Sequence, residues 1–185
     1  MKLLLVLSLM TVLAACSVKP QVLKVEPKLD FQSLNGVKVP IELQVEDKRA
    51  NSDLLGYLNA KNEGPISFEE SLVKSLGVSL QKAMLEQGID MNRRPEPLST
   101  LKVTIEKLKY SSPNKDWVSR IELEGEIVIS INRGPASLTK RFTANRAQDV
   151  ATSPNQEFNQ KYLNALLSEL FNKAMNDKEV TGFLK

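Results

Sequence analysis

The most regular pattern in this chain is an alternation of apolar and polar residues between positions 121 and 131. Successive side chains of a β-strand point to opposite faces of its sheet, so this alternation predicts a strand with one buried and one solvated face. Weaker alternation at residues 37–45, 101–110 and 138–147 predicts three more strands. In the second of these segments the alternation changes phase near residues 106–107, which predicts a β-bulge.

Two other segments repeat their apolar residues every three to four positions, as amphipathic helices do. The first is predicted over residues 68–87, with a capping box made by Ser67 and Glu70 and with Gly88 as the residue that ends it.

The second helix is expected to begin at Ser153 and Pro154, taken as N-cap and first helical residue, and its apolar stripe continues to Ala174. Asp177 is expected to cap a last short helical turn. The order strand, helix, three strands, helix predicts an α+β domain. We expect a mostly antiparallel sheet of four to five strands, with the two main helices packed on one face.

The predicted organisation has three parts. Residues 1–15 are expected to be a lipoprotein signal peptide, and residues 16–35 a lipidated cysteine and tether with a short edge strand at 22–25. Residues 36–185 form a single α+β domain, expected in the periplasm. Asp47, Asn51, Asp53 and Asn62 lie in one loop of this domain, but their spacing does not match a calcium-binding EF-hand loop.

Composition limits the possible chemistry. The 185 residues are 42% hydrophobic and 25% charged, which is typical of a globular protein. The chain has one cysteine and no histidine, which excludes an intrachain disulfide, histidine-assisted nucleophiles and histidine-ligated metal sites. A formal net charge of +3 is too small to indicate nucleic-acid binding. We therefore expect no enzymatic activity and no cofactor other than a covalent lipid.

The N-terminus has the pattern of a secretory signal. Lys2 precedes an apolar run that ends at Ala15, which is too short to span a bilayer as a helix. The only cysteine of the chain follows directly, in the sequence Leu-Ala-Ala-Cys at residues 13–16.

This sequence resembles the bacterial lipobox. The resemblance implies diacylglyceryl transfer to the Cys16 thiol, cleavage before Cys16 and acylation of the new amine. Position 17 is Ser and not Asp. In enterobacterial-type sorting this implies the periplasmic face of the outer membrane, reached through the lipid anchor.

Beyond the lipobox, the mature chain resembles the YajG-type outer-membrane lipoproteins. The shared features are residues 36–39 leading to Val-Glu-Asp-Lys-Arg at 45–49, the helix at 72–88, the paired strands around Ile105 and Ile127, and the closing Phe-Leu-Lys. The resemblance implies a location and a fold, and it supplies no catalytic residues.

Candidate partner-binding residues are few. Trp117 is the only tryptophan, a residue type enriched at binding hot spots. The basic pairs Arg93–Arg94 and Lys140–Arg141 are candidates for contact with anionic headgroups or a phosphate-bearing glycolipid. Each of these residues has an alternative reading as ordinary core packing or solvated surface charge.

Glu122, Glu124 and Glu126 share one face of the strand predicted at 121–131. Their spacing of roughly 6.5–7 Å between alternate residues is near the carboxyl separation of inverting glycosidases. The plainer interpretation is the polar face of an amphipathic strand, paired with Lys102, Lys107 or Lys109. We therefore expect a non-catalytic binding, accessory or scaffold lipoprotein that faces an unknown envelope protein or glycolipid. The alternatives are a lipid-binding or glycolipid-binding transport accessory, with its ligand between helices and sheet, and a glycan hydrolase.

Overall fold

The computed structural model describes residues 18–37, 40–89, 91, 99–115, 118–151 and 153–185. The elements are, in chain order, β1 (Gln21–Leu23), η1 (Gln32–Leu34), β2 (Ile41–Asp47), β3 (Leu54–Tyr57), β4 (Pro65–Phe68), α1 (Leu72–Glu86), β5 (Ser99–Ser111), β6 (Asn114–Lys115), β7 (Val118–Arg133), β8 (Ala136–Val150), α2 (Gln156–Met175) and α3 (Lys178–Leu184).

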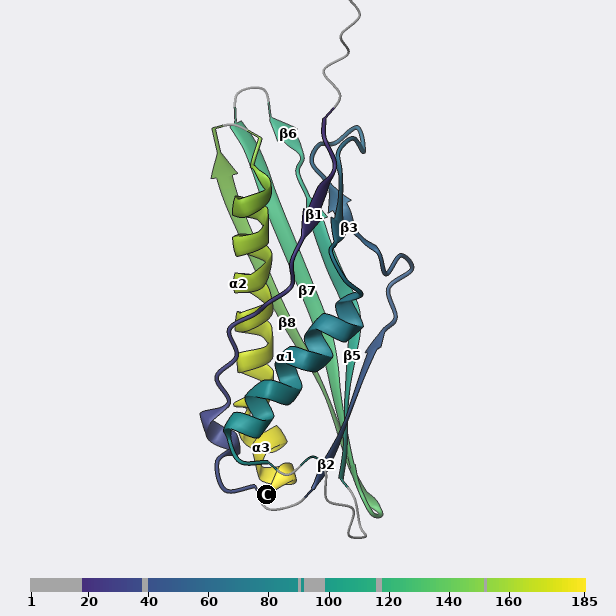
Figure 1. The fold of residues 1–185 in the computed structure, drawn as a ribbon, viewed down its shortest axis with the longest axis vertical. Coiled ribbons are helices and arrows are strands. Elements are labelled where there is room, and N and C mark those ends of the chain that lie inside the picture. Colours follow the sequence, from purple (N-terminus) through teal and green to yellow (C-terminus); the bar gives the residue numbers. More distant parts are fainter. Residues whose placement is uncertain (1–17, 38–39, 90, 92–98, 116–117, 152) are drawn as a thin grey trace, which may run out of the picture.

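The strands form one mixed sheet, with order β1-β4-β3-β5-β7-β6, β2 beside β5 and β8 beside β7. The antiparallel ladders of β5, β7 and β8 run along the long axis of the molecule (Figure 1). Three other pairings are parallel, namely β1 with β4, β2 with β5 and β3 with β5. The expectation of a mostly antiparallel sheet of four to five strands is therefore correct for the ladders of β5, β7 and β8. It underestimates the number of strands in the whole sheet and misses the parallel pairings.

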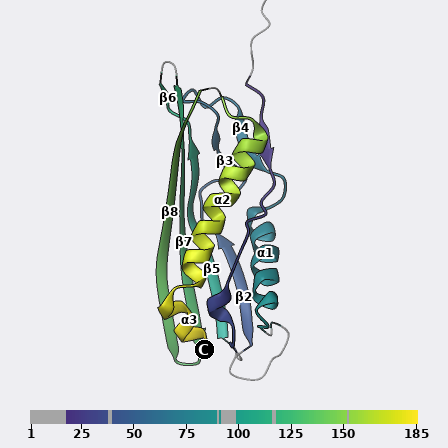
Figure 2. The ribbon, with the colours of Figure 1, turned by 90° about the vertical axis from the view of Figure 1, so that its left-hand side faces the viewer.

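The parallel pairing of β2 with β5 has a topological reason. Parallel neighbours need a crossover connection, and here β3, β4 and α1 lie between the two strands in the chain. All three helices cover the same face of the sheet, as expected for the two main ones (Figure 2). The hydrophobic core fills the space between these helices and the sheet. No helix in the described part of the chain is long and apolar enough to cross a membrane.

Several local predictions are confirmed. The register of β5 against β7 shifts between Ile105 and Lys107, where the bulge was expected. Gly88 ends α1 with a φ of +77°, and the Asp177 carboxylate caps α3 by accepting from the N–H groups of Glu179 and Val180.

The predicted starts of both long helices are wrong. Ser67 does not cap α1, because its backbone pairs with Val22 in the β1–β4 ladder and the helix begins after Ser71. For α2 the N-cap is Asn155, whose Oδ1 accepts from the N–H of Phe158. The carbonyl of Pro154 instead accepts a hydrogen bond from Gln21, so β1 fixes where the helix begins.

Gly125 explains how closely α2 lies on the sheet. A Cβ built on this residue of β7 would lie 3.1 Å from Leu170 and 3.3 Å from Leu166, both on α2. A side chain at residue 125 would therefore need both leucines to shift by a few tenths of an ångström, so the absence of one here fits the close approach of α2.

A tether was predicted at residues 16–35, but the described part of this segment is folded. The short edge strand predicted within it at 22–25 is confirmed as β1, which lies at Gln21–Leu23 on the edge of the sheet. β1 belongs to the sheet, and Val25, Phe31 and Leu34 are buried in the core. Apolar and charged residues alternate in this segment from Leu23 to Phe31, as in a strand. Its hydrogen-bond partners, however, lie on α2, near the other end of the chain, where no local pattern records them.

Candidate functional site

An extended segment crosses the helical face of the molecule between α1 and α2 (Figure 1). We call this segment, residues 24–31, the strap. Odd-numbered side chains such as Val25 and Phe31 enter the core, and the even-numbered ones are exposed. The strap therefore has the side-chain alternation of a β-strand without lying in the sheet.

Polar side chains of α2 hold one edge of the strap. The N–H groups of Lys24, Glu26, Lys28 and Asp30 donate at 2.7–3.0 Å to the side-chain oxygens of Gln160, Asn164, Ser168 and Asn172 respectively. These α2 residues recur every four positions and so form one row along the helix. Asn164 and Asn172 also return hydrogen bonds to the carbonyls of Lys24 and Lys28. The row replaces the neighbouring strand that an extended segment normally has.

The other edge of the strap faces α1. The backbone of a strand points alternately to its two sides, so the odd-numbered residues direct their N–H and C=O groups away from α2. Leu23 does this within β1, where its carbonyl accepts from the N–H of Glu69 directly after β4. Beyond that point the chain of β4 turns away into α1. Among the described residues, no hydrogen bond to the backbone of Val25 or Leu29 is found on this edge.

A groove lies between this edge and α1, with a volume of about 680 Å³. We call it the strap groove. Its lining residues are 24–29 on the strap, Glu69 and Glu70 before α1, and Ser75, Val78, Ser79, Lys82, Ala83 and Glu86 on the helix. The groove continues the line of β4, so it lies where a further strand would pair with the strap.

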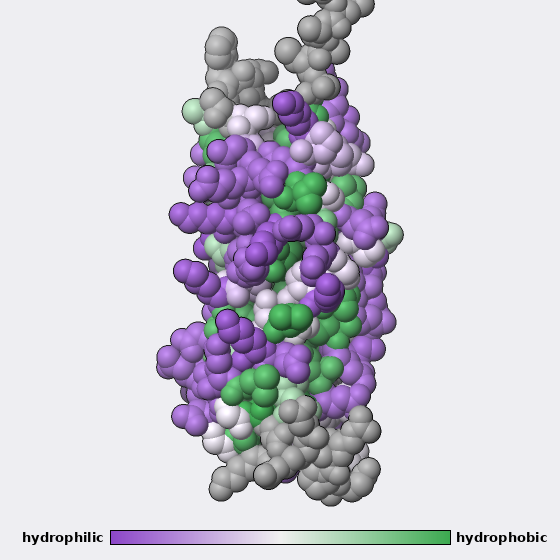
Figure 3. Space-filling model, in the orientation of Figure 1, coloured by the Kyte–Doolittle hydropathy of each residue, from purple (hydrophilic) through white to green (hydrophobic). Residues whose placement is uncertain are grey.

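The surface around the strap groove is apolar in the middle and charged at its margins. Val78 is 61% exposed and Leu85, two turns further along α1, is 48% exposed. Hydrophobic surface follows the middle of this face in a broken line with hydrophilic surface on both sides (Figure 3). Lys24 pairs with Glu26 at 2.7 Å, and the hydrogen bond that the ammonium donates to this carboxylate raises the pKa of the lysine.

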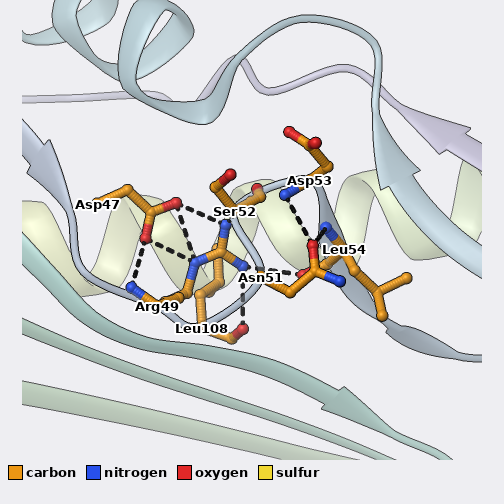
Figure 4. A network of polar contacts seen from close by, with 7 residues as sticks. All are labelled: Asp47, Arg49, Asn51, Ser52, Asp53, Leu54 and Leu108. Carbon is orange, nitrogen blue, oxygen red and sulfur yellow. Dashed lines mark hydrogen bonds and ion pairs between the residues drawn. The ribbon is translucent and has the colours of Figure 1, made fainter.

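A buried ion pair fixes the loop between β2 and β3. The guanidinium of Arg49 donates to both carboxylate oxygens of Asp47 at 2.7–3.2 Å, and to the carbonyls of Ser52 and Leu54 at 2.6 and 3.0 Å (Figure 4). Asn51 Oδ1 accepts from the N–H groups of Asp53 and Leu54. Of the four oxygen-bearing side chains in this loop, Asp47 and Asn51 therefore bond within the loop itself. The charged end of the family-like segment at residues 45–49 acts structurally.

A second hollow, of about 760 Å³, lies between residues 49–62 and the second half of β5. Lys107, Lys109 and Glu122 contribute polar groups to its lining. Neither hollow lies between helices and sheet, where the glycolipid alternative placed its ligand and where buried side chains pack instead.

The three glutamates of β7 lie on the open face of the sheet, and each has a cation beside it. Glu122 pairs with Arg120 at 2.8 Å, Glu124 pairs with Lys107, and Glu126 pairs with Arg141. The expected cross-strand pairing with Lys107 is confirmed. This arrangement favours the amphipathic-strand interpretation over a pair of catalytic carboxylates.

The candidate partner residues do not form one cluster. Lys140 and Arg141 are adjacent in β8 and therefore point to opposite faces of the sheet. Lys140 bonds Asp177 at 2.8 Å on the helical side, which raises the pKa of the lysine and lowers that of the carboxylate, whereas Arg141 meets Glu126 on the open side. Both are engaged in intramolecular ion pairs.

The other residues predicted for the site, Cys16, Arg93, Arg94 and Trp117, lie outside the residues that the structure describes. The strap groove was not predicted from the sequence. Two signals were present: the alternation of apolar and charged residues at 23–31, and the hydrogen-bonding side chains at every fourth position from Gln160 to the C-cap Asn176, along the border of the apolar stripe of α2.

One comparison with a solved structure supports this fold. A Xanthomonas campestris protein of the family DUF330 shares it, with a TM-score of 0.54, 11% identity, and coverage of 90% of this chain and 97% of that one. A minor lipoprotein of Acinetobacter baumannii is similar at a TM-score of 0.39 and 10% identity, over 77% of this chain and 89% of its own. No curated protein matches the chain.

The family Lipoprotein_16, described as uncharacterized lipoprotein, matches residues 27–185. Because that match spans nearly all of the folded body, the chain belongs to this family of uncharacterised lipoproteins.

Proposed function

We propose that this protein is a non-catalytic lipoprotein of the YajG type, anchored by lipid on Cys16 to the periplasmic face of the outer membrane. The lipobox at residues 13–16, the Ser at position 17 and membership of a lipoprotein family support the anchor and its location. Replacing Cys16 with Ser and fractionating cells tests it. Retention of the Cys16→Ser variant in the outer membrane would contradict lipid anchoring.

Its work is to bind another envelope protein in the strap groove, as an accessory subunit or scaffold. The observation that carries this proposal is the strap edge that faces the groove in line with β4. An extended peptide that adds to such an edge gains main-chain hydrogen bonds, while pockets beside it select alternate side chains. Pro27 contributes no N–H, so the register of an added strand is restricted.

The charges at the groove favour a protein partner over an anionic lipid. Lys24, Lys28 and Lys82 line it together with Glu26, Glu69, Glu70 and Glu86, so both signs are present within one groove. A site for anionic lipid headgroups or for nucleic acid would need an excess of positive charge. The exposed side chains of Val78 and Leu85 add apolar surface of the kind that marks interaction sites.

Photocrosslinking in cells tests the groove directly. A photoreactive residue replaces Val78 or Lys82 at the groove, and Thr139 on β8 in a matched control, because Thr139 is also exposed. A recurrent protein adduct at the two groove positions, absent at position 139, supports the proposal. Adducts to lipid or glycan alone would favour the glycolipid alternative, and identical adducts at all three positions would contradict a specific groove.

Val78→Asp supplies a second readout. This side chain is 61% exposed, so the substitution places a charge in the groove without disturbing the core. We expect the adduct formed from position 82 to be lost while the protein level stays unchanged. An undiminished adduct would show that the partner does not contact Val78.

A further inference from the structure

The folded body begins almost immediately after the lipidation cysteine. Val18 is only two residues from Cys16, and it already packs against the core. Its Cγ1 lies 2.5 Å from the position that a Cβ on Gly64 would occupy, and Leu58 Cδ1 lies 2.8 Å from the same point. The side chain of Val18 is therefore seated on the turn between β3 and β4, residues 58–64.

Covalent geometry then limits how far the anchor can be from this turn. Consecutive Cα atoms are about 3.8 Å apart, so the Cα of Cys16 lies within about 8 Å of that of Val18. A flexible tether of some twenty residues would have let the body rotate freely above the headgroups. Two residues do not allow this while Val18 stays packed.

We propose that the body rests directly on the membrane, with the β3–β4 turn as its membrane-facing surface and its long axis directed into the periplasm. This inference rests on the lipid anchor of the proposed function. Lys19 and Lys61 are both exposed at this end, as anionic phospholipid headgroups require. Ala60, Asn62 and Glu63 of the turn are exposed as well. Glu63 is the acidic residue of the turn, and its carboxylate accepts a hydrogen bond from Asn59, so with the two lysines a net charge of 2 − 1 = +1 remains at this surface.

The opposite end of the molecule is far from the bilayer in this orientation. β7 has 16 residues and runs along the long axis (Figure 1). At about 3.3 Å per residue it spans roughly 50 Å. α3, the C-terminus and the turn between β7 and β8 lie at that far end (Figure 1). The strap groove then lies on the side of the body, between the two ends, where a periplasmic protein can reach it.

Fluorescence quenching by spin-labelled lipid tests the orientation. The single cysteine of the chain becomes a thioether when it is lipidated, so an introduced cysteine is the only free thiol. Lys61→Cys and Lys178→Cys form a matched pair, because both lysines are exposed and they lie at opposite ends. Each lipidated full-length variant is labelled with a thiol-reactive fluorophore. It is then reconstituted into vesicles of phosphatidylethanolamine and phosphatidylglycerol that carry nitroxide headgroups.

We expect strong quenching at position 61 and none at position 178. A third variant inserts ten Gly and Ser residues between Ser17 and Val18, giving a linker of roughly 5–6 Å × √10 in root-mean-square length. This insertion should remove most of the difference between the two positions.

Equal quenching at both positions without the insertion, or stronger quenching at 178, would overturn the orientation while leaving the anchor intact. Failure of the lipidated protein to float with the vesicles would instead overturn the anchor, and the orientation with it. The two failures are therefore distinguishable.

Discussion

The ion pair of Asp47 and Arg49 gives the sharpest test of how the loop between β2 and β3 is held. Its side chains are only 3% and 6% exposed, and the guanidinium has its carboxylate and carbonyl partners within the protein. Arg49→Met keeps much of the aliphatic volume and removes every one of these donors. It leaves the carboxylate of Asp47 buried without its cation.

The expected cost follows from that unpaired charge. Removing one partner of a buried ion pair costs about 3–5 kcal/mol, because the remaining charge is neither solvated nor neutralised. The carbonyls of Ser52 and Leu54 lose their donor at the same time, and this loss is part of the same range. Adding Asp47→Asn to Arg49→Met removes the stranded charge. We expect the double variant to be more stable than the sum of the single effects predicts, by about 1–3 kcal/mol.

Urea unfolding of an anchor-free version that starts at Ser17, followed by far-ultraviolet circular dichroism, measures these free energies. The control is Arg141→Met. Its ion pair with Glu126 has side chains that are 60% and 24% exposed, and such a surface pair contributes about 1 kcal/mol or less. The reasoning would be refuted if Arg49→Met cost no more than Arg141→Met, or if the effects at positions 47 and 49 were simply additive.

Three further predictions concern the strap, a close backbone contact and a buried tyrosine. Asn164→Ala with Asn172→Ala removes two hydrogen bonds at each position and should cost about 1–3 kcal/mol. Hydrogen exchange should speed up at the amides of residues 26 and 30, and unchanged exchange there would contradict the row of bonds. Gly56→Ala should destabilise by about 1–3 kcal/mol, because its Cβ would lie 2.2 Å from the carbonyl oxygen of Tyr110. Gly77 lies in α1, and an added Cβ there would have no atom within 4 Å, so Gly77→Ala should stabilise the protein by up to about 1 kcal/mol. Thermal melting of the two glycine variants tests these opposite effects. Burial raises the pKa of Tyr110 to about 12. An unfolded tyrosine ionises near pH 10, so the free energy of unfolding should fall between about pH 10 and 12. Across this pH range, the urea midpoint of Tyr110→Phe should fall less steeply with pH than that of the unmodified protein. An equal pH dependence of the two midpoints would contradict the raised pKa of Tyr110.

Local patterns predicted the elements whose partners are close in sequence or whose faces are uniform. The alternation at 121–131 lies in β7, and the phase change at 106–107 is the observed bulge. The stripes of α1 and α2 correctly indicated two long helices on one face. Their starts were missed because Ser67 and Pro154 are engaged with β1, a contact that no local signal records.

The candidate site was the least predictable part. Adjacent charges such as Lys140 and Arg141 look like one basic patch in sequence, yet in a strand they belong to opposite faces. The glutamates of β7 were interpreted from the sequence as surface groups in preference to catalytic ones, and the cations beside them agree with that interpretation. The strap groove is formed by residues 24–29 and α1, and no pattern in the sequence indicates that these two segments lie side by side.

The sequence by itself determined whether each main element is a helix or a strand. Burial of one face of an element sets the spacing of its apolar residues, and this spacing can be read from a short stretch of sequence. The sequence also determined the likeness to a lipobox, because that motif is contiguous. Only the tertiary structure decided that residues 24–31 form a strap and not a tether. Glu26 finds its hydrogen-bond acceptor 138 residues further along the chain, so its extended conformation is stabilised by a helix that folds elsewhere in the sequence.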